Sequence, residues 1–62
     1  MRVGERIRFY RKERGLTQAE LAALANVSVF TLRQYERGAR LAPRIEQLTK
    51  LASALDISVE NL

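Results

Sequence analysis

The sequence of 62 residues contains neither cysteine nor histidine. Without cysteine the chain can form no disulfide and no thiolate metal site, and without histidine it lacks a common general base and metal ligand. Its seven acidic residues are scattered, and neither a glycine-rich phosphate loop nor a metal-ligand spacing occurs. We therefore expect no enzyme activity, no cofactor, no metal site and no small-molecule ligand.

Long apolar runs are also missing. No stretch approaches the length of a membrane span, and no signal-peptide pattern begins the chain. We therefore expect no membrane association and an intracellular location. A chain of this length buries only about 60% of the surface that it exposes when unfolded. Residues 1–62 are thus predicted to form a single small domain of modest stability.

Positive charge, by contrast, is abundant: the net charge is +4 and the sequence pI is about 10.4. This balance favours an anionic partner, although solubility alone is an alternative explanation for a small basic domain. The basic residues fall into two groups, Arg2, Arg6, Arg8, Arg11, Lys12 and Arg14 near the start and Arg33, Arg37, Arg40 and Arg44 later on. Between Val29 and Arg44 the only acidic residue is Glu36, so the second group is hardly balanced.

The central part of the chain predicts two short helices joined by a tight turn. Thr17 and Glu20 have the spacing of a capping box, in which a hydroxyl and a carboxylate each accept a hydrogen bond from a free amide. Leu21 and Ala25, four residues apart, share one face of the helix that follows. We expect this helix to end at Asn26, because asparagine tolerates a left-handed backbone better than most residues with a side chain.

The second of the two helices begins shortly after this turn. Ser28 is a favourable N-cap for it. Leu32 and Tyr35 form its inward face, and Gly38 ends it. Two helices separated by three or four residues form the helix-turn-helix pattern, in which the second helix, here residues 28–36, can be presented as a probe.

Three further helices complete the predicted all-α fold, a compact bundle of five short helices. The core stripe of the first helix is Val3, Ile7 and Tyr10. This helix ends at Gly15, and Pro43 suits the start of the fourth, where its missing amide donor is not needed. The apolar stripe of the fourth helix is Ile45, Leu48, Leu51, Ala52 and Leu55. Asp56 ends that helix, and Ser58 can cap a last helical turn over residues 59–62.

Several of these positions together resemble a known family. They are Gly15-Leu16-Thr17-Gln18, Glu20-Leu21-Ala22, Val27-Ser28 and Tyr35-Glu36-Arg37-Gly38. The set is similar to the lambda-repressor/Cro-like helix-turn-helix domains of bacteria and their phages, also called XRE-like regulators, and the resemblance extends from Val3 to Leu62. It implies sequence-specific binding of double-stranded DNA in the bacterial cytoplasm, to repress or activate transcription.

The residues that would read bases lie on the outward face of residues 28–36. With Leu32 and Tyr35 inward, the outward positions are Val29, Phe30, Arg33 and Gln34, and they face base edges if this helix enters the major groove. Gln34 can contact adenine through two hydrogen bonds. Val29 and Phe30 replace polar residues that are usual in the family. They can pack on thymine methyl groups, or Phe30 can fold back on the preceding helix and add only stability.

Other positions are implied to hold the protein on the DNA backbone. The candidate phosphate contacts are Gln18, Ser28, Arg37, Arg40 and Arg44. Gln18 opens the first motif helix, where free amides and the helix dipole favour an anion, although a local contact to the backbone is the alternative. Arg11 and Glu36 match residues that form an ion pair in related domains, so Arg11 is expected to be structural, although the edge of its guanidinium group can still reach a phosphate.

Family members bind palindromic sites as two-fold dimers. The matching dimer contacts fall on Leu41, Asp56, Val59 and Leu62. We expect a homodimer that is weak in solution and strengthened on DNA. The resemblance also has departures: Asn26 and Asp56 replace glycines that are usual in the family, which predicts two slightly strained turns.

The alternative function is that of a protein-interaction module, antitoxin-like or coactivator-like, without direct base readout. Its docking surface would consist of Phe9, Leu24, Val29 and Phe30. The arginines around residues 28–36 argue against this alternative, because a protein-docking face does not need them.

Overall fold

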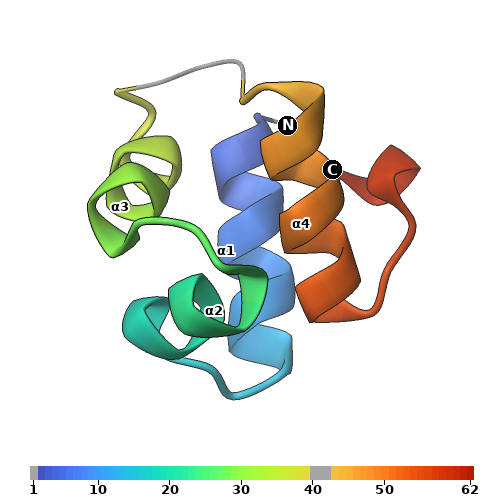
Figure 1. Cartoon of the computed structure of the whole chain (residues 1–62), viewed down its shortest axis with the longest axis horizontal. Coiled ribbons are helices and arrows are strands. Elements are labelled where there is room, and N and C mark those ends of the chain that lie inside the picture. Colours follow the sequence, from blue (N-terminus) through green and yellow to red (C-terminus); the bar gives the residue numbers. More distant parts are fainter. Residues whose placement is uncertain (1, 40–42) are drawn as a thin grey trace.

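The computed structural model describes residues 2–39 and 43–62. In this part of the chain the fold is all-helical, as expected, with four α-helices and no strand. The helices are α1 (Val3–Glu13), α2 (Gln18–Ala25), α3 (Val29–Arg37) and α4 (Ile45–Leu55), shown in Figure 1. None of these helices is long and apolar enough to cross a membrane.

The fifth predicted helix is not an α-helix. Val59–Asn61 form a single 3-10 turn, η1, and the side chain of Ser58 does not cap it. The amides of Asn61 and Leu62 donate to the carbonyls of Ser58 and Val59, both at 3.0 Å. A segment of this length is too short to sustain the four-residue hydrogen-bond pattern of an α-helix, which explains the difference from the prediction.

Two helices end in a left-handed residue other than glycine, as the sequence predicts. Asn26 has a φ of 56° after α2, and Asp56 has a φ of 57° after α4. The amide of Asp56 donates to the carbonyl of Ser53 at 3.1 Å, which closes the last turn of α4. The left-handed backbone costs most residues with a side chain roughly 1–2 kcal/mol, and somewhat less for asparagine and aspartate. Both turns therefore hold a small amount of backbone strain.

The core is built from one buried face of each α-helix. The fully buried large side chains are Ile7, Leu21, Leu32, Leu51 and Leu55. The predicted stripe of α4 is wrong at its first member, since Ile45 is 66% exposed. Ile45 is the first residue of α4, and helical side chains point back toward the N-terminus, so this one points off the end of the helix and away from the core.

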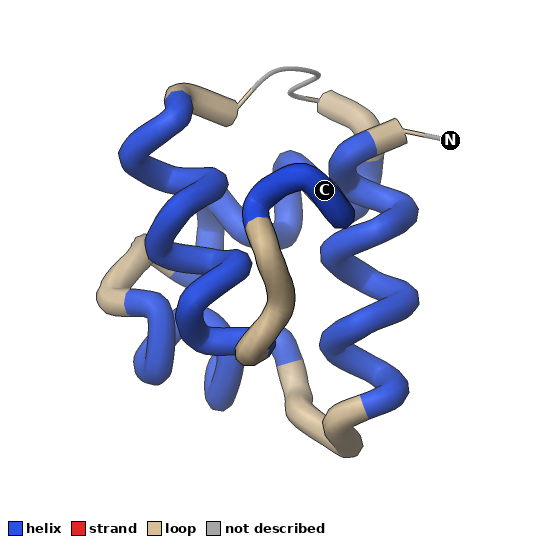
Figure 2. The backbone as a smooth tube through the Cα atoms, turned by 90° about the vertical axis from the view of Figure 1, so that its right-hand side faces the viewer, coloured by secondary structure: helices blue, strands red, loops and turns tan. Residues whose placement is uncertain are grey.

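Each α-helix packs mainly against two others. Helix α1 packs between α3 and α4, and α2 packs against both of those helices (Figure 1). The segment after α4 turns back along the outer side of α4 (Figures 1 and 2), and η1 packs against α4. Arg6 of α1 and Arg14, which follows the last residue of α1, hold this segment there. Arg6 Nη1 donates to the carbonyl of Asn61 at 3.2 Å, and Arg14 Nη2 donates to the carbonyl of Asp56 at 3.4 Å.

Gly4 brings the backbones of α1 and α3 into direct contact. A Cβ atom at this position would overlap the carbonyl oxygen of Tyr35 and lie 2.7 Å from its carbonyl carbon and 3.2 Å from Glu36 Cα. A residue with a side chain would therefore force the two helices apart. This close contact at the start of α1 sets the position of the last turn of α3.

Candidate nucleic-acid interface

The burial pattern of α3 divides this helix into an inward and an outward face. Leu32 is fully buried and Tyr35 is 4% exposed, as their spacing predicts. Ser28 precedes the helix as its N-cap, with its hydroxyl oxygen 3.5 Å from the amide of Thr31, and Gly38 follows with a φ of 79°. The helix covers Val29–Arg37, one residue later at each end than the predicted range 28–36.

The first two residues of α3 are both apolar but lie in different environments. Val29 is partly buried and packs against the core. Phe30 is 62% exposed. Of the two alternatives for Phe30, folding back to add stability is therefore the weaker one. Phe30 is the apolar side chain that projects from the start of α3.

The other two outward positions, Arg33 and Gln34, also differ from each other. Arg33 is exposed, whereas Gln34 is half-buried. The Oε1 atom of Gln34 is buried and has no hydrogen-bond partner among the described residues. A two-bond contact to adenine uses this oxygen as acceptor and Nε2 as donor. The carboxamide of Gln34 would therefore have to turn outward before it could make that contact.

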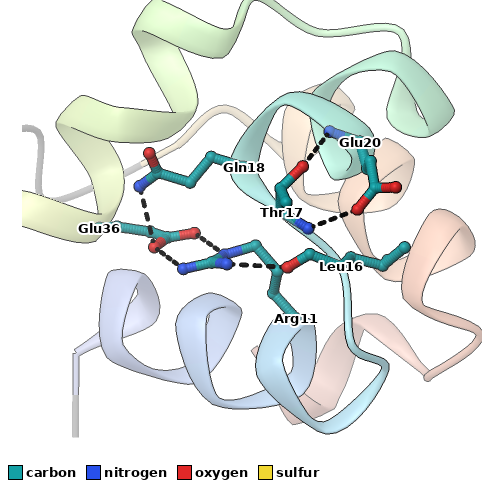
Figure 3. A network of polar contacts seen from close by, with 6 residues as sticks. All are labelled: Arg11, Leu16, Thr17, Gln18, Glu20 and Glu36. Carbon is teal, nitrogen blue, oxygen red and sulfur yellow. Dashed lines mark hydrogen bonds and ion pairs between the residues drawn. The ribbon is translucent and has the colours of Figure 1, made fainter.

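An ion pair joins α1 to the last turn of α3 (Figure 3). Arg11 Nε donates to Glu36 Oε2 at 2.8 Å, and Arg11 Nη2 donates to Glu36 Oε1 at 2.9 Å. The two side chains are 11% and 4% exposed. Arg11 Nη1 also donates to the carbonyl of Leu16 at 2.8 Å, which ties the pair to the loop before α2. The two buried charges are thus paired and hydrogen-bonded, the arrangement in which burial of a charge is tolerated.

Gln18, the first residue of α2, joins the same network. Its Nε2 donates to Glu36 Oε1 at 3.2 Å (Figure 3). The partner is a side chain of α3 and not the local backbone, which was the alternative to phosphate binding. Nε2 carries two hydrogens, so this bond leaves one donor for an anion at the start of α2. The network therefore links the start of α2 to the end of α3.

The start of α2 is itself held by the capping box that the sequence predicts. The amide of Thr17 donates to Glu20 Oε1 at 2.8 Å, and the amide of Glu20 donates to Thr17 Oγ1 at 3.0 Å (Figure 3). These reciprocal bonds satisfy two amides that would otherwise have no partner. They define where α2 begins and so place the side chain of Gln18 beside Glu36.

The ion pair also changes the charge that α3 presents to solvent. Glu36 is the only acid between Val29 and Arg44, and its carboxylate is buried against Arg11. Arg33 and Arg37 are exposed on α3, and Arg44 is exposed before α4. The outward side of this region therefore carries several arginines and no exposed carboxylate of its own.

The candidate phosphate contacts lie at the ends of helices. Gln18 is the first residue of α2, and Ser28 and Arg44 are the N-caps of α3 and α4. Arg37 is the last residue of α3, and Arg40 lies outside the described residues. The first amides of a helix have no carbonyl partner within it, so three of these residues stand beside donors that suit an anion.

The residues considered for dimer contacts differ in their surroundings. Leu41 lies outside the described residues. Asp56 is exposed, and Val59 is half-buried in η1. Leu62 is half-buried and packs against the core, so part of its apolar surface is already used within the chain.

Three residues that shape the packing around α1 are not predicted from the sequence. They are Gly4, Arg6 and Arg14. A signal for Gly4 exists, because a glycine inside a predicted helix costs about 1 kcal/mol relative to alanine and so suggests a packing reason. No signal separates Arg6 and Arg14 from the exposed Arg8. Their carbonyl partners lie 55 and 42 residues away in the chain.

The chain is similar in sequence to known helix-turn-helix proteins. Residues 7–62 match the helix-turn-helix family HTH_3. The chain is 42% identical over 60 residues to the HTH-type transcriptional regulator SinR of Bacillus subtilis (strain 168), a match that covers 97% of this chain and 54% of SinR. The chain thus spans about half the length of the curated relatives that it matches.

Two similar solved structures contain DNA. The crystal structure of SinR, the master regulator for biofilm formation, in complex with DNA has a TM-score of 0.90 and 42% sequence identity, and covers 92% of this chain and 90% of that chain. The P22 c2 repressor in complex with synthetic operator 9T has a TM-score of 0.86 and 37% identity, and covers 97% of this chain and 89% of that chain.

Proposed function

The chain belongs to the helix-turn-helix family HTH_3, and from this we propose that it is a sequence-specific DNA-binding regulator of transcription. α2 and α3 form the helix-turn-helix, and α3 is the recognition helix in the major groove of double-stranded DNA. The observation that carries the proposal is the exposure of arginines on the outward face of α3. The one acidic residue of this helix, Glu36, is buried against Arg11. The two DNA-bound relatives support it.

In this proposal the contacts to DNA are of two kinds. The residues that face base edges are Val29, Phe30, Arg33 and Gln34. The residues that contact phosphates are Gln18, Ser28, Arg37, Arg40 and Arg44. Base contacts select the sequence, whereas phosphate contacts position the protein and make its affinity depend on salt. Arg11 and Glu36 hold the end of α3 as a structural ion pair.

We further infer that the protein binds a palindromic operator as a two-fold dimer, with half-sites about one helical turn apart. The dimer contact involves Leu41, Asp56, Val59 and Leu62. Leu62 already packs against the core, so part of its apolar surface is used within the chain. Association is therefore weak in solution and is strengthened when both copies bind the same operator. The protein acts in the cytoplasm of a bacterium, encoded by the bacterium or by a phage.

Salt-dependent binding to a random-sequence duplex tests the core of this proposal. Each neutralised phosphate contributes about 0.9 to the slope of log K against log salt. We expect micromolar or tighter binding at low salt. For Arg37→Gln the magnitude of this slope should be smaller by about one. Lys50→Gln is the matched control, because it removes the same charge from an exposed residue of α4 that lines a groove beside α2.

Two results would contradict DNA binding through α3. One is the absence of salt-sensitive binding at micromolar protein, which would favour the protein-interaction module. The other is an equal change of slope for Lys50→Gln and Arg37→Gln, because a general loss of positive charge would then explain both.

A further inference from the structure

The start of α3 carries an aromatic side chain that is mostly exposed. Phe30 is 62% exposed, whereas its neighbour Val29 packs against the core. Phe30 is the second residue of α3, among the N-terminal positions with which recognition helices contact base edges. Its surface is therefore available to DNA without any loss of packing in the domain.

A phenylalanine ring limits what can be read at this position. It has no hydrogen-bond donor or acceptor of the conventional kind, so it cannot recognise the donor and acceptor pattern of a base pair. The apolar group that a base presents in the major groove is the 5-methyl group of thymine. Cytosine presents only a hydrogen at the equivalent carbon, unless that carbon is methylated.

The other outward residues of α3 do not offer an equivalent apolar surface. Val29 is partly buried, and Arg33 is charged. Gln34 is half-buried with its Oε1 turned inward. Contact with a methyl group at the start of α3 therefore falls to Phe30.

We propose that Phe30 makes DNA binding depend on the 5-methyl group of a pyrimidine in the major groove. The protein then distinguishes thymine from uracil, and 5-methylcytosine from cytosine, at the base pair that faces Phe30. This inference rests on the proposed DNA-binding function and adds to it the chemical group that is recognised. Burial of one methyl-sized group changes a binding constant by roughly fourfold, so the effect is measurable at a single position.

The test uses duplexes selected by the protein from a randomised library. Each thymidine of a selected duplex is replaced in turn by deoxyuridine, which removes the methyl group and leaves the hydrogen-bonding groups unchanged. We expect at least one replacement to weaken binding by roughly fourfold. At the same position, 5-methylcytosine should bind more tightly than cytosine by a similar factor.

Two variants assign the effect to its residue. Phe30→Ala should bind the thymine and uracil duplexes equally well, and its melting temperature should match that of the parent because the ring is exposed. Phe9→Ala is the matched control: it removes the phenylalanine of α1, which is 52% exposed, and should keep the full difference between the duplexes.

Three results would overturn the proposal while leaving DNA binding intact. They are selected sites without a thymine preference, equal binding of every thymine and uracil pair, and a Phe30→Ala variant that still discriminates between them. Failure to bind any duplex is a different outcome, because it would overturn the proposed function together with this inference.

Discussion

Replacement of Gly4 by alanine tests whether the close contact of α1 with α3 is a requirement of the fold. Two effects oppose each other at this position. Alanine is about 1 kcal/mol more favourable than glycine within a helix. The added Cβ, however, would overlap the carbonyl oxygen of Tyr35 and lie 2.7 Å from its carbonyl carbon. Since the obstacle is backbone, no rotation of a side chain can relieve the overlap, and α1 must move away from α3.

The magnitudes decide which effect prevails. Insertion of one methyl group into a well-packed contact costs about 1–3 kcal/mol, and a backbone obstacle places Gly4→Ala near the upper limit. After subtraction of the gain in helix propensity, the net loss of unfolding free energy is about 2 kcal/mol. A shift of about 4–8 °C in melting temperature for each kcal/mol gives an expected fall of about 8–16 °C.

Thermal unfolding followed by circular dichroism measures this change, and urea unfolding gives the free energy directly. Glu5→Ala is the control, because it alters the next residue of the same turn, which is exposed. Its unfolding free energy should stay within about 0.5 kcal/mol of the parent value. A Gly4→Ala variant that melts at or above the parent temperature would show that helix propensity outweighs the contact, contrary to this prediction.

Two further stability predictions follow from charged residues at helix ends. Glu36→Ala should lower the unfolding free energy by about 3 kcal/mol, since it leaves the Arg11 guanidinium buried without its partner. An unchanged urea midpoint would contradict this, as would an equal loss in the exposed control Glu46→Ala. Asp56→Gly should raise the unfolding free energy by about 1 kcal/mol, because it relieves a left-handed backbone and removes an acid from a helix C-terminus. Asp56→Asn, which removes only the charge, should gain less, and a melting temperature of Asp56→Gly below that of the parent would count against the strain.

The positions of the helices could be predicted because their signals are local. Thr17, Glu20 and Asn26 mark the start and end of α2 through hydrogen bonds and backbone preferences within a few residues. The spacing of apolar residues likewise predicts that Leu32 and Tyr35 point inward. The errors lie at helix ends, at Ile45 and at η1, where the apolar pattern no longer constrains the backbone.

The candidate site was predicted less completely. The association of Arg11 with Glu36 came from the family resemblance, because the two residues are 25 positions apart and no spacing rule connects them. The hydrogen bond from Gln18 to Glu36 and the inward turn of Gln34 Oε1 had no sequence signal. Such contacts form only when helices that are distant in the chain pack together.

The helical class, the buried face of most helices and the excess of positive charge follow from the sequence alone, since these depend on neighbours within about four residues or on composition. Packing between the helices determines which polar and apolar side chains stay exposed and available to a partner. It pairs Arg11 with Glu36, directs Arg6 and Arg14 to carbonyls of the C-terminal segment, and leaves the arginines of α3 exposed. It also packs Val29 against the core and leaves Phe30 in solvent. A charged or aromatic side chain becomes paired or buried only where packing brings a partner to it.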